Sequence, residues 1–452
     1  MSQAPDSPAR VMESLRDSWD RSDWLFDLVP RERWVTRGIE LRHPFLFYIG
    51  HLPAFGFNHI AAALGDSGLD PELDVLFARG IDPADEGEAE GLRPTEWPSV
   101  RTAEDYRDRA RAAIAERVPQ LAVAAADHPV ARDVMSLVLE HELMHHETLL
   151  YMIRQLDPDV LRVPGDHRPP ELGVAHMSPG RVDIAAGPVR LGVDLAEIPF
   201  AWDNEVPAEQ LQVPAFAMDR VPVTVRQFLE FVRSGGYDDE SLWTPKNLEW
   251  LRGEGRGAPL GWRKAGAGWQ VRSLFAWHDL HDVGGWPVQV SHAEALAYAA
   301  WSGARLPTEA ELHRAAFTAP DGSERPFPWG DAAPGPQHGV FDFGVHGRAP
   351  VGSRPEGASA WGVHDLVGNG WEWTSTPFLP RPGFAPIHPN YPGYSSDFFD
   401  GEHFVVFGGS WATDAALLRR SFRNWYQGRY PYVFSAFRTV ARSSGRVGFS
   451  SR

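Results

Sequence analysis

The feature that most restricts the fold is a long apolar stripe between Val130 and Leu156. Apolar residues and two histidines recur there at steps of three or four, which is the spacing of one face of an α-helix. The stripe consists of Val134, Val138, His141, His145, Leu149, Met152 and Leu156. We therefore predict a helix over this range, with the stripe packed against a core and the two histidines one turn apart within it.

His141 and His145 indicate a metal site on this helix. Two imidazoles at positions i and i+4 project from one face and can bind the same metal ion, and histidine is the commonest metal ligand. A single buried histidine more often serves as a hydrogen-bonded part of a core. Two histidines in register, with carboxylates beside them, favour the metal site over that simpler interpretation.

The same helix allows a second function, because its residues also spell H-E-x-x-H, the metal-binding motif of zinc proteases. Glu142 would then be the general base. The longer metzincin form of the motif requires glycine at position 148 and histidine at position 151, whereas the chain has Thr148 and Tyr151. A carboxylate ligand further along, such as Glu171, is compatible with the pattern. A zinc-dependent hydrolase therefore stays an alternative at this point.

Residues 1–160 are predicted to form a four-helix bundle with a long crossover loop. The predicted helices span residues 11–26, 44–58, 106–117 and 130–156. Residues 65–100 are rich in glycine, proline and acidic side chains and are expected to form the loop. Because proline removes a backbone donor and clashes with the preceding turn, Pro53 should kink or interrupt the second helix, and Pro119 should end the third.

His51, on the second helix, is the natural third ligand, because bundles build metal sites from side chains on facing helices. Phe47 and Phe55 lie one turn before and one turn after it. His59 and His146 are poorer candidates. His146 follows His145 directly and so projects about 100° away from the apolar stripe.

The composition excludes several classes of protein. With 452 residues the chain is too long for one ordinary core, so two or more domains are expected. A net charge of −17 argues against binding to nucleic acid or to an anionic membrane, and no apolar run is long enough to span a bilayer. Residues 1–10 lack the layout of a signal peptide, so we expect a cytoplasmic protein. The absence of cysteine excludes disulfides, cysteine-bound zinc, iron–sulfur clusters and thiol nucleophiles.

The character of the sequence changes after a linker predicted over residues 161–180. Short strands and many glycines replace the helical stripes, and 14 of the 18 tryptophans lie from Trp202 onward, where they are expected to fill a core poor in regular structure. Two short helices carry capping-box signals, Ser291 with Glu294 and Thr308 with Glu311. The predicted class is α+β, with a second domain over residues 181–452.

Ordered blocks from residue 222 onward resemble the formylglycine-generating-enzyme (sulfatase-modifying factor) domain, a variant of the C-type lectin fold. The blocks are P-V-T at 222–224, P-V-Q-V-S at 287–291, G-A-R-L-P-T-E-A-E at 303–311, F-P-W-G at 327–330, G-N-G-W-E-W at 368–373, G-G-S-W at 408–411 and F-R at 437–438. Their order over more than half of the chain makes the match specific. The formylglycine-generating enzymes themselves use a cysteine pair at copper, so a chain without cysteine cannot carry out that reaction.

The preceding bundle resembles the DinB-like family and carries H-x-x-x-H-x-E. The combination of the two domains is similar to the non-heme iron sulfoxide synthases of ergothioneine biosynthesis and to the related selenoneine synthases. The resemblance implies one iron(II) held by His51, which follows a glycine, and by His141 and His145, with Glu147 two residues further on. The order of these features outweighs the protease interpretation, which accounts for nothing after residue 156.

The resemblance also implies the substrates, which are small molecules. In that family O2 and a sulfur or selenium donor react with hercynine, the betaine of histidine, and a C–S or C–Se bond forms at the imidazole. Asn424 and Trp425 would contact hercynine, and a tyrosine would donate a proton near the oxygen. Tyr391 and Tyr394 are the candidates for that tyrosine, with packing of their loop as the alternative role.

Two positions depart from the ergothioneine enzymes that use γ-glutamylcysteine. Met144 stands where those enzymes carry glutamine, and Tyr426 where they carry aspartate. Their arginine-rich loop, which binds carboxylates of the donor, has no match in residues 78–83. We therefore expect a less charged donor, a selenosugar or free cysteine, with one anionic group held by residues 428–430. An ordinary ergothioneine enzyme that uses γ-glutamylcysteine is the alternative.

Overall fold

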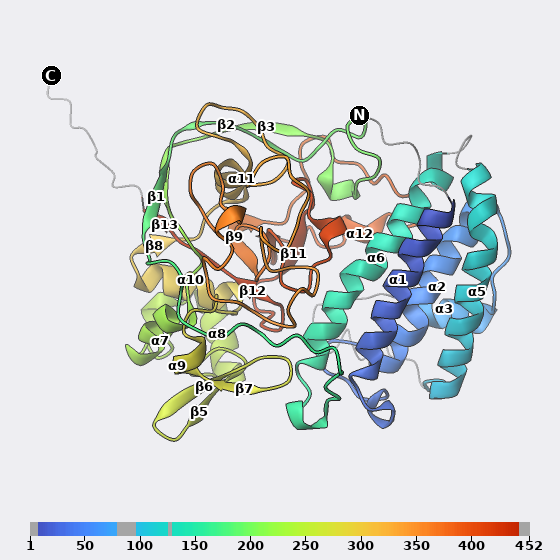
Figure 1. The fold of residues 1–452 in the computed structure, drawn as a ribbon, viewed down its shortest axis with the longest axis horizontal. Coiled ribbons are helices and arrows are strands. Elements are labelled where there is room, and N and C mark those ends of the chain that lie inside the picture. The colour runs from blue at the N-terminus through green and yellow to red at the C-terminus, as the bar shows by residue number, and fades with distance from the viewer. Residues whose placement is uncertain (1–7, 79–95, 125–128, 443–452) are drawn as a thin grey trace, which may run out of the picture.

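The computed structural model describes residues 8–78, 96–124 and 129–442. A helical part, coloured blue to cyan, lies beside a part built from short strands and short helices, coloured green to red (Figure 1). This arrangement confirms the predicted α+β class. Residues 79–83, in which no counterpart of the arginine-rich loop was found, lie outside the described residues. Over the described part of the chain, no helix combines the length and apolarity needed to cross a lipid bilayer.

Four long helices form the bundle, as the periodicity predicts. The helices of this part are α1 (Pro8–Asp27), α2 (Phe45–Leu64), α3 (Pro71–Ala78), α5 (Val100–Ala124) and α6 (Pro129–Ile153), with a 3-10 helix η1 at Arg31–Arg33. Helix α2 packs against α3, α5 and α6, while α1 packs against α5 and α6. Residues 45–57 of α2 are all buried, as expected of a helix that is apolar on every side.

Two details of the predicted bundle are wrong. Pro119 lies inside α5, which does not end there. Pro53 lies inside α2 and does not interrupt it, while a kink at Pro53 stays a prediction. A proline in a helix interior costs about 3 kcal/mol of stability. In α5 the burial of neighbours such as Val118 and Leu121 offsets this cost, because most helical stability in proteins comes from packing. The expected loop over residues 65–100 contains helix α3.

The segment after α6 lies against the second part of the protein. A 3-10 helix, η2 (Pro158–Val160), follows α6, and residues 161–180 form neither helix nor strand. The backbone N–H of Glu171 donates to the carbonyl oxygen of Arg348 at 3.0 Å, so this segment is bound to the later residues. The division of the chain into domains at residues 160 and 180 stays a prediction.

The second part contains four small sheets. Its strands are β1 (Arg181–Ile184), β2 (Gly187–Leu191), β3 (Glu209–Val213), β4 (Phe216–Asp219), β5 (Trp262–Ala265), β6 (Gly268–Arg272), β7 (Trp277–Asp279), β8 (Ala304–Arg305), β9 (Trp371–Pro377), β10 (His403–Phe407), β11 (Asn424–Gln427), β12 (Ser435–Ala436) and β13 (Val440–Ala441). The strand orders are β1-β4-β13-β8, β11-β10-β9-β12, β2-β3 and β5-β6-β7. Strand β12 pairs with β9 in parallel, and the other pairs are antiparallel.

Short helices connect these strands. They are α7 (Val225–Arg233), α8 (Pro245–Glu254), α9 (Leu280–Val283), α10 (His292–Trp301), α11 (Glu309–Phe317) and α12 (Gly393–Ser396), with 3-10 helices η3 (Asp203–Glu205), η4 (Glu240–Leu242), η5 (Pro355–Gly357) and η6 (Ala415–Leu417). Both predicted capping boxes are present. The backbone N–H of Glu294 donates to Ser291 Oγ at 3.2 Å, and that of Glu311 donates to Thr308 Oγ1 at 3.1 Å.

One hydrophobic core runs through both parts of the protein. Trp202, Trp286 and Trp373 are among its largest fully buried side chains, which confirms that tryptophan fills the core of the second part. Helix α6 is joined to that part by a buried carboxylate. Glu140 accepts a hydrogen bond from Trp202 Nε1 at 2.8 Å and two from the guanidinium of Arg419 at 2.8 and 2.9 Å. The bundle and the second part are therefore one packed unit.

Gly50→Ala is expected to destabilise the protein by about 1–3 kcal/mol, because an added Cβ would lie 2.5 Å from three ring atoms of buried Phe77. Gly253→Ala, in the exposed helix α8, is the matched control. Nothing lies within 4 Å of its Cβ position, and alanine favours a helix more than glycine does. Urea unfolding followed by circular dichroism measures both changes. Wild-type stability of the Gly50 variant would contradict the close contact between α2 and α3.

Candidate metal centre

Three histidines predicted as metal ligands lie together between α2 and α6. His51 comes from α2, and His141 and His145 come from α6. Each offers one ring nitrogen, and the three nitrogens lie within 4.8 Å of one another. The ring centres are 5.2 Å apart for His51 and His141, 5.0 Å for His51 and His145, and 4.5 Å for His141 and His145. The structure thus brings together the three side chains, while their binding of a metal stays a prediction.

Neighbouring groups fix the orientation of these rings. His51 Nδ1 lies 2.7 Å from the backbone oxygen of Phe77, the residue before the last of α3, so the carbonyl accepts a hydrogen bond and leaves Nε2 free. Such a bond to the far nitrogen is the usual support of a metal-binding histidine. His141 stacks on Phe55 with ring centres 3.4 Å apart, and His51 stacks on Phe47 at 4.8 Å.

The chemistry of the three rings fits a divalent transition metal. Burial lowers the pKa of His51 to about 4, and burial and neighbouring histidines hold the pKa values of His141 and His145 well below their usual range. The rings are therefore neutral, which is the form that binds metal. His51 Nε2 and the Nδ1 atoms of His141 and His145 are buried without a hydrogen-bond partner. Buried polar atoms are rarely left unpaired, so these nitrogens are suited to a ligand.

The other two histidines considered from sequence lie outside this cluster. His59 Nδ1 lies 2.9 Å from the backbone oxygen of Phe55, one turn earlier on α2. His146 Nε2 lies 3.0 Å from Ser22 Oγ of α1, on the far side of α6. Both positions agree with the expectation that these two residues are poorer ligands.

Glu142 is turned away from the three histidines. Ser22 Oγ donates to Glu142 Oε1 at 2.6 Å, which places the carboxylate against α1, and burial raises its pKa to about 6. Glu171, the other carboxylate considered for a zinc enzyme, pairs with Arg354 at 2.5 Å. A hydrolase of the H-E-x-x-H type needs its glutamate at the metal, so the geometry does not support that alternative.

A cavity of about 150 Å³ lies beside the histidine cluster, between α6 and the second part of the protein. His141 and His145 line it from α6. It is also lined by all the residues that the sequence proposed for substrate binding and proton transfer, namely Met144, Tyr391, Tyr394, Asn424, Trp425 and Tyr426. The structure therefore brings these residues together at one site, although they come from three separate stretches of the chain.

The two candidate tyrosines keep their protons. Burial raises the pKa of Tyr391 to about 12 and holds that of Tyr394 well above its usual range. Tyr394 stacks on Trp202 with ring centres 4.1 Å apart, and its hydroxyl lies 3.4 Å from Met144 Sδ, which sits between His141 and His145 in the sequence. Both phenols can donate a proton, and Tyr394 directs its hydroxyl toward α6.

Residues 424–426 belong to β11, an edge strand of its sheet, and line the cavity. Asn424 Nδ2 donates to the hydroxyl of Tyr426 at 3.3 Å, and Asn424 Oδ1 accepts from the backbone N–H of Trp425 at 2.8 Å. Trp425 stacks on Phe378 with ring centres 4.0 Å apart and an angle of 7°. The asparagine amide and the indole are therefore held in fixed positions.

The sequence did not predict Arg42, the one arginine among the described residues that line the cavity. Its Nε donates to the hydroxyl of Tyr430 at 3.0 Å, and its Nη2 donates to that of Tyr151 at 2.8 Å. The expectation that residues 428–430 hold an anionic group is not supported, because Arg429 pairs with Glu402 at 2.8 Å and does not line the cavity. No periodic sequence pattern predicts the position of Arg42, because its hydrogen-bond partners Tyr151 and Tyr430 lie far from it along the chain.

Glu147 also lines the cavity, and its carboxylate is held by the second part of the protein. Trp371 Nε1 and Thr413 Oγ1 each donate to it at 2.9 Å. Burial raises the pKa of Glu147 to about 7. The motif position of Glu147 is visible in the sequence, but its partners are 224 and 266 residues away along the chain.

Comparison with protein families finds two matched domains. The description "Sulfatase-modifying factor enzyme 1-like domain" matches residues 169–443, and the DinB superfamily matches residues 14–149. Both predicted resemblances, of the bundle and of the second part, are thereby confirmed.

Comparison with curated proteins gives relatives over most of the chain. A hercynine oxygenase from Mycolicibacterium smegmatis is 40% identical over 310 residues, which cover 67% of this chain and 70% of that protein. One from Mycolicibacterium thermoresistibile is 41% identical over 323 residues, covering 69% and 70%. Ergothioneine biosynthesis protein 1 of Neurospora crassa is 27% identical over 516 residues. That match covers 96% of this chain but 58% of the fungal protein, so the chain spans less than two thirds of it.

His51→Ala is expected to weaken iron(II) binding by more than about 100-fold, since it removes a ligand and not merely a supporting group. His59→Ala is the matched control, because His59 lies on the same helix and outside the cluster. Anaerobic titration with iron(II) and elemental analysis measure the metal bound by each folded variant. Full iron content in the His51 variant would contradict the assignment of the third ligand.

Proposed function

Because the chain belongs to the ergothioneine-type synthase family, we propose that it joins a sulfur or selenium donor to the imidazole of hercynine, using iron(II) and O2. The observation that carries the proposal is the cluster of three neutral histidines at a cavity whose walls come from both matched domains. The proposed enzyme is thus an oxidoreductase that forms a C–Se or C–S bond.

His51, His141 and His145 would hold the iron. Three neutral imidazoles would not neutralise the charge of iron(II), and the bound metal would supply the activation of O2 beside the two substrates. Burial keeps these rings neutral, and the backbone carbonyl of Phe77 fixes the orientation of the His51 ring. The protein's own contribution is then to bring the two substrates into reacting geometry and to exclude water.

Hercynine is proposed to lie against β11. Asn424 and Trp425 line the cavity there, next to Tyr391 and Tyr394. The trimethylammonium group of a betaine is attracted to the faces of aromatic rings, and the cavity wall supplies several. The asparagine amide offers both a donor and an acceptor to polar atoms of the substrate.

Tyr394 is proposed as the proton donor. Its raised pKa keeps the phenol protonated at neutral pH, and its hydroxyl faces α6 next to the histidine pair. The ring of Tyr391 instead contacts those of Phe55 and His59 on α2, with centres 5.4 and 6.0 Å apart. A proton leaving Tyr394 would be delivered inside the cavity, where a general acid is effective only within hydrogen-bonding reach.

The donor is proposed to be a selenosugar, with free cysteine second. Met144, Tyr394 and Tyr426 lie along the cavity, and methionine is soft and packs well beside sulfur or selenium. The hydroxyl of Tyr426 can hydrogen-bond to a sugar hydroxyl. Among the described lining residues, Arg42 is the one arginine, and there is no lysine. A single guanidinium suits one anionic group better than the dianionic γ-glutamylcysteine.

The donor is tested by competition. After anaerobic loading with iron(II), the protein receives hercynine, O2 and equal concentrations of a 1-seleno-sugar, cysteine and γ-glutamylcysteine, and mass spectrometry counts the products. We expect the selenium product to exceed the γ-glutamylcysteine product by at least about tenfold. A double variant, Met144→Gln with Tyr426→Asp, restores the residues of the dipeptide-using enzymes and should shift the preference toward γ-glutamylcysteine. A wild-type preference for that dipeptide would refute the donor, and absence of any hercynine adduct would refute the reaction.

Glu142→Gln separates the oxygenase from the hydrolase. Glutamine preserves the shape of the side chain and can still accept the hydrogen bond from Ser22, so hercynine-dependent O2 uptake should stay within about threefold of wild type. An oxygen electrode and elemental analysis for iron provide the measurement. Complete loss of turnover with normal iron content would favour a general-base role for Glu142.

A further inference from the structure

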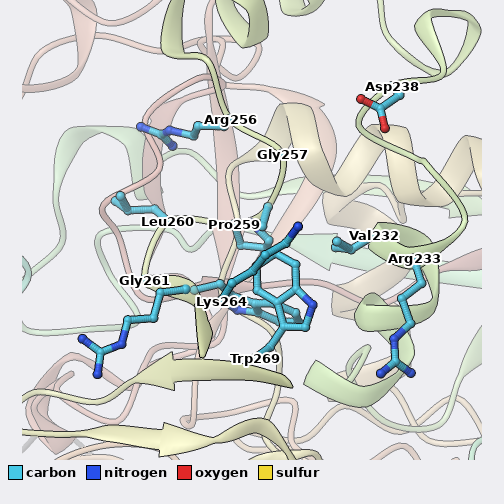
Figure 2. Close-up of a pocket in the computed structure, with 13 residues that line it drawn as sticks. Val232, Arg233, Asp238, Arg256, Gly257, Pro259, Leu260, Gly261, Lys264 and Trp269 are labelled. Atoms are coloured by element: carbon cyan, nitrogen blue, oxygen red, sulfur yellow. The ribbon is translucent and has the colours of Figure 1, made fainter. Parts of the chain in front are cut away.

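A second, larger cavity of about 710 Å³ lies on the surface of the second part of the protein. Its walls are the end of α7, the loop after that helix, the segment before β5 and the β5–β6 hairpin. Figure 2 shows Trp269 and Lys264 at its centre, with Asp238 and Arg233 on one side and Arg256 on the other. It shares no lining residue with the cavity at the histidines, so the proposed reaction makes no use of it.

Strand alternation gives this cavity an aromatic floor. In the antiparallel pair of β5 and β6, Trp262 lies opposite Val271, and Lys264 lies opposite Trp269. Because side chains alternate between the two faces of a hairpin, Trp262, Lys264 and Trp269 share one face. The two indole rings have centres 6.1 Å apart and an angle of 63°, and Lys264 Nζ lies 5.6 Å from the centre of the Trp269 ring. Both indoles are only half-buried, so they offer a surface on which a flat ring can stack.

The cavity wall carries more basic than acidic side chains although the chain is acidic, and two of the basic ones are ion-paired, Arg233 with Glu230 and Arg256 with Glu254. Arg233, Arg256, Arg263 and Lys264 line it together with one carboxylate, Asp238, whereas the whole chain has a net charge of −17. Across the described residues, neither Lys264 nor Arg263 forms an ion pair. Their contacts are with aromatic rings and, for Arg263, with a glutamine amide. A cleft lined by one sign of charge concentrates ligands of the opposite sign.

Two buried guanidinium groups add to this potential from behind the cavity wall. Gly261 lines the cavity, and a Cβ there would lie 2.7 Å from Arg154 Nη2 and 3.6 Å from the Cβ of Arg272. Both arginines are buried, and within the described part of the chain neither pairs with a carboxylate. Arg154 donates instead to Gln289 Oε1 at 2.8 Å. Burial and the nearby Arg272 lower the pKa of Arg154 to about 9, as expected for a cation without a counter-ion.

We propose that this cavity binds a small anionic ligand that carries a flat ring, with the ring on Trp262 and Trp269 and the anionic group on Lys264. The anionic group is a phosphate or a carboxylate, since both accept several hydrogen bonds from ammonium and guanidinium groups. Asp238, on the opposite wall, is placed to accept a hydrogen bond from an N–H or O–H of the ring. The site is independent of the iron chemistry, and its volume is that of an ordinary small-molecule pocket.

The proposal is tested by calorimetric titration of the full-length protein with adenosine monophosphate, indole-3-acetate, adenosine and inorganic phosphate. Saturable binding is expected for at least one of the two ring anions, with adenosine and phosphate weaker by about tenfold or more, since each lacks one of the two recognised groups. The relative affinity of the two ring anions tells a phosphate site from a carboxylate site. No saturable binding of either ring anion, or equal binding of inorganic phosphate, would overturn the proposal.

Variants locate the ligand. Lys264→Glu should weaken binding by about tenfold or more, and Trp269→Ala should weaken it as well. Lys246→Glu is the matched control, because Lys246 is the chain's other lysine, lies outside the cavity and pairs with Glu402 at 2.6 Å. Hercynine is added as a competitor. Unchanged affinity in the Lys264 variant, or displacement of the ligand by hercynine, would overturn the assignment to this cavity.

Discussion

The structure depends on one requirement of helix α6, which is that each of its buried polar side chains must find a partner. Glu140 and Glu147 are satisfied by the second part of the protein, and Glu142 and His146 by Ser22 of α1. The two histidines of the metal centre face the remaining direction, toward α2 and the cavity. The polar side chains on several faces of α6 thus have fixed partners, and rotation of the helix would leave buried polar groups without hydrogen bonds.

The carboxylates of α6 also position the cavity walls. Removing a carboxylate from water is costly unless hydrogen bonds replace the lost hydration. Trp202 and Arg419 replace it at Glu140, and Trp371 and Thr413 replace it at Glu147. Because these donors belong to the second part, the same bonds that stabilise the carboxylates bring β9, η3 and η6 to the histidine cluster. The bundle thus helps to position the walls that the second part contributes to the cavity beside the histidines.

Local patterns in the sequence were enough to predict the elements whose causes are local. The histidine pair follows from helical spacing, and both capping boxes follow from residues three positions apart. His51 was proposed as the third ligand because its aromatic neighbours repeat on the same helix. The failure at Pro119 has the opposite cause, because the local penalty of a proline is offset by packing that only the assembled bundle provides.

Features that depend on long-range contacts could not be predicted from local patterns in the sequence. Helix α3 lies in a stretch with the composition of a loop, yet its Phe77 carbonyl orients His51. Arg42 enters the cavity wall only when residues more than a hundred positions away fold around it, and Arg429, which sequence proximity favoured, is bound to Glu402. The clustering of the three candidate ligands was thus predictable, whereas their supporting groups and the position of Arg42 in the cavity wall were not.

The hydrogen bonds between Glu140 and Arg419 restrict how freely the two matched domains can be exchanged between relatives. They join the two matched domains through Glu140 of the bundle, whose guanidinium partner Arg419 lies in the second part and also pairs there with Glu205. A bundle transplanted from a relative would leave the indole of Trp202 and one side of the Arg419 guanidinium without an acceptor unless it also carried a carboxylate at that point, although Arg419 would keep its ion pair with Glu205. Recombination between family members is therefore expected to tolerate changes in the cavity more readily than changes at this contact between the domains, so donor specificity can diverge while the architecture stays intact.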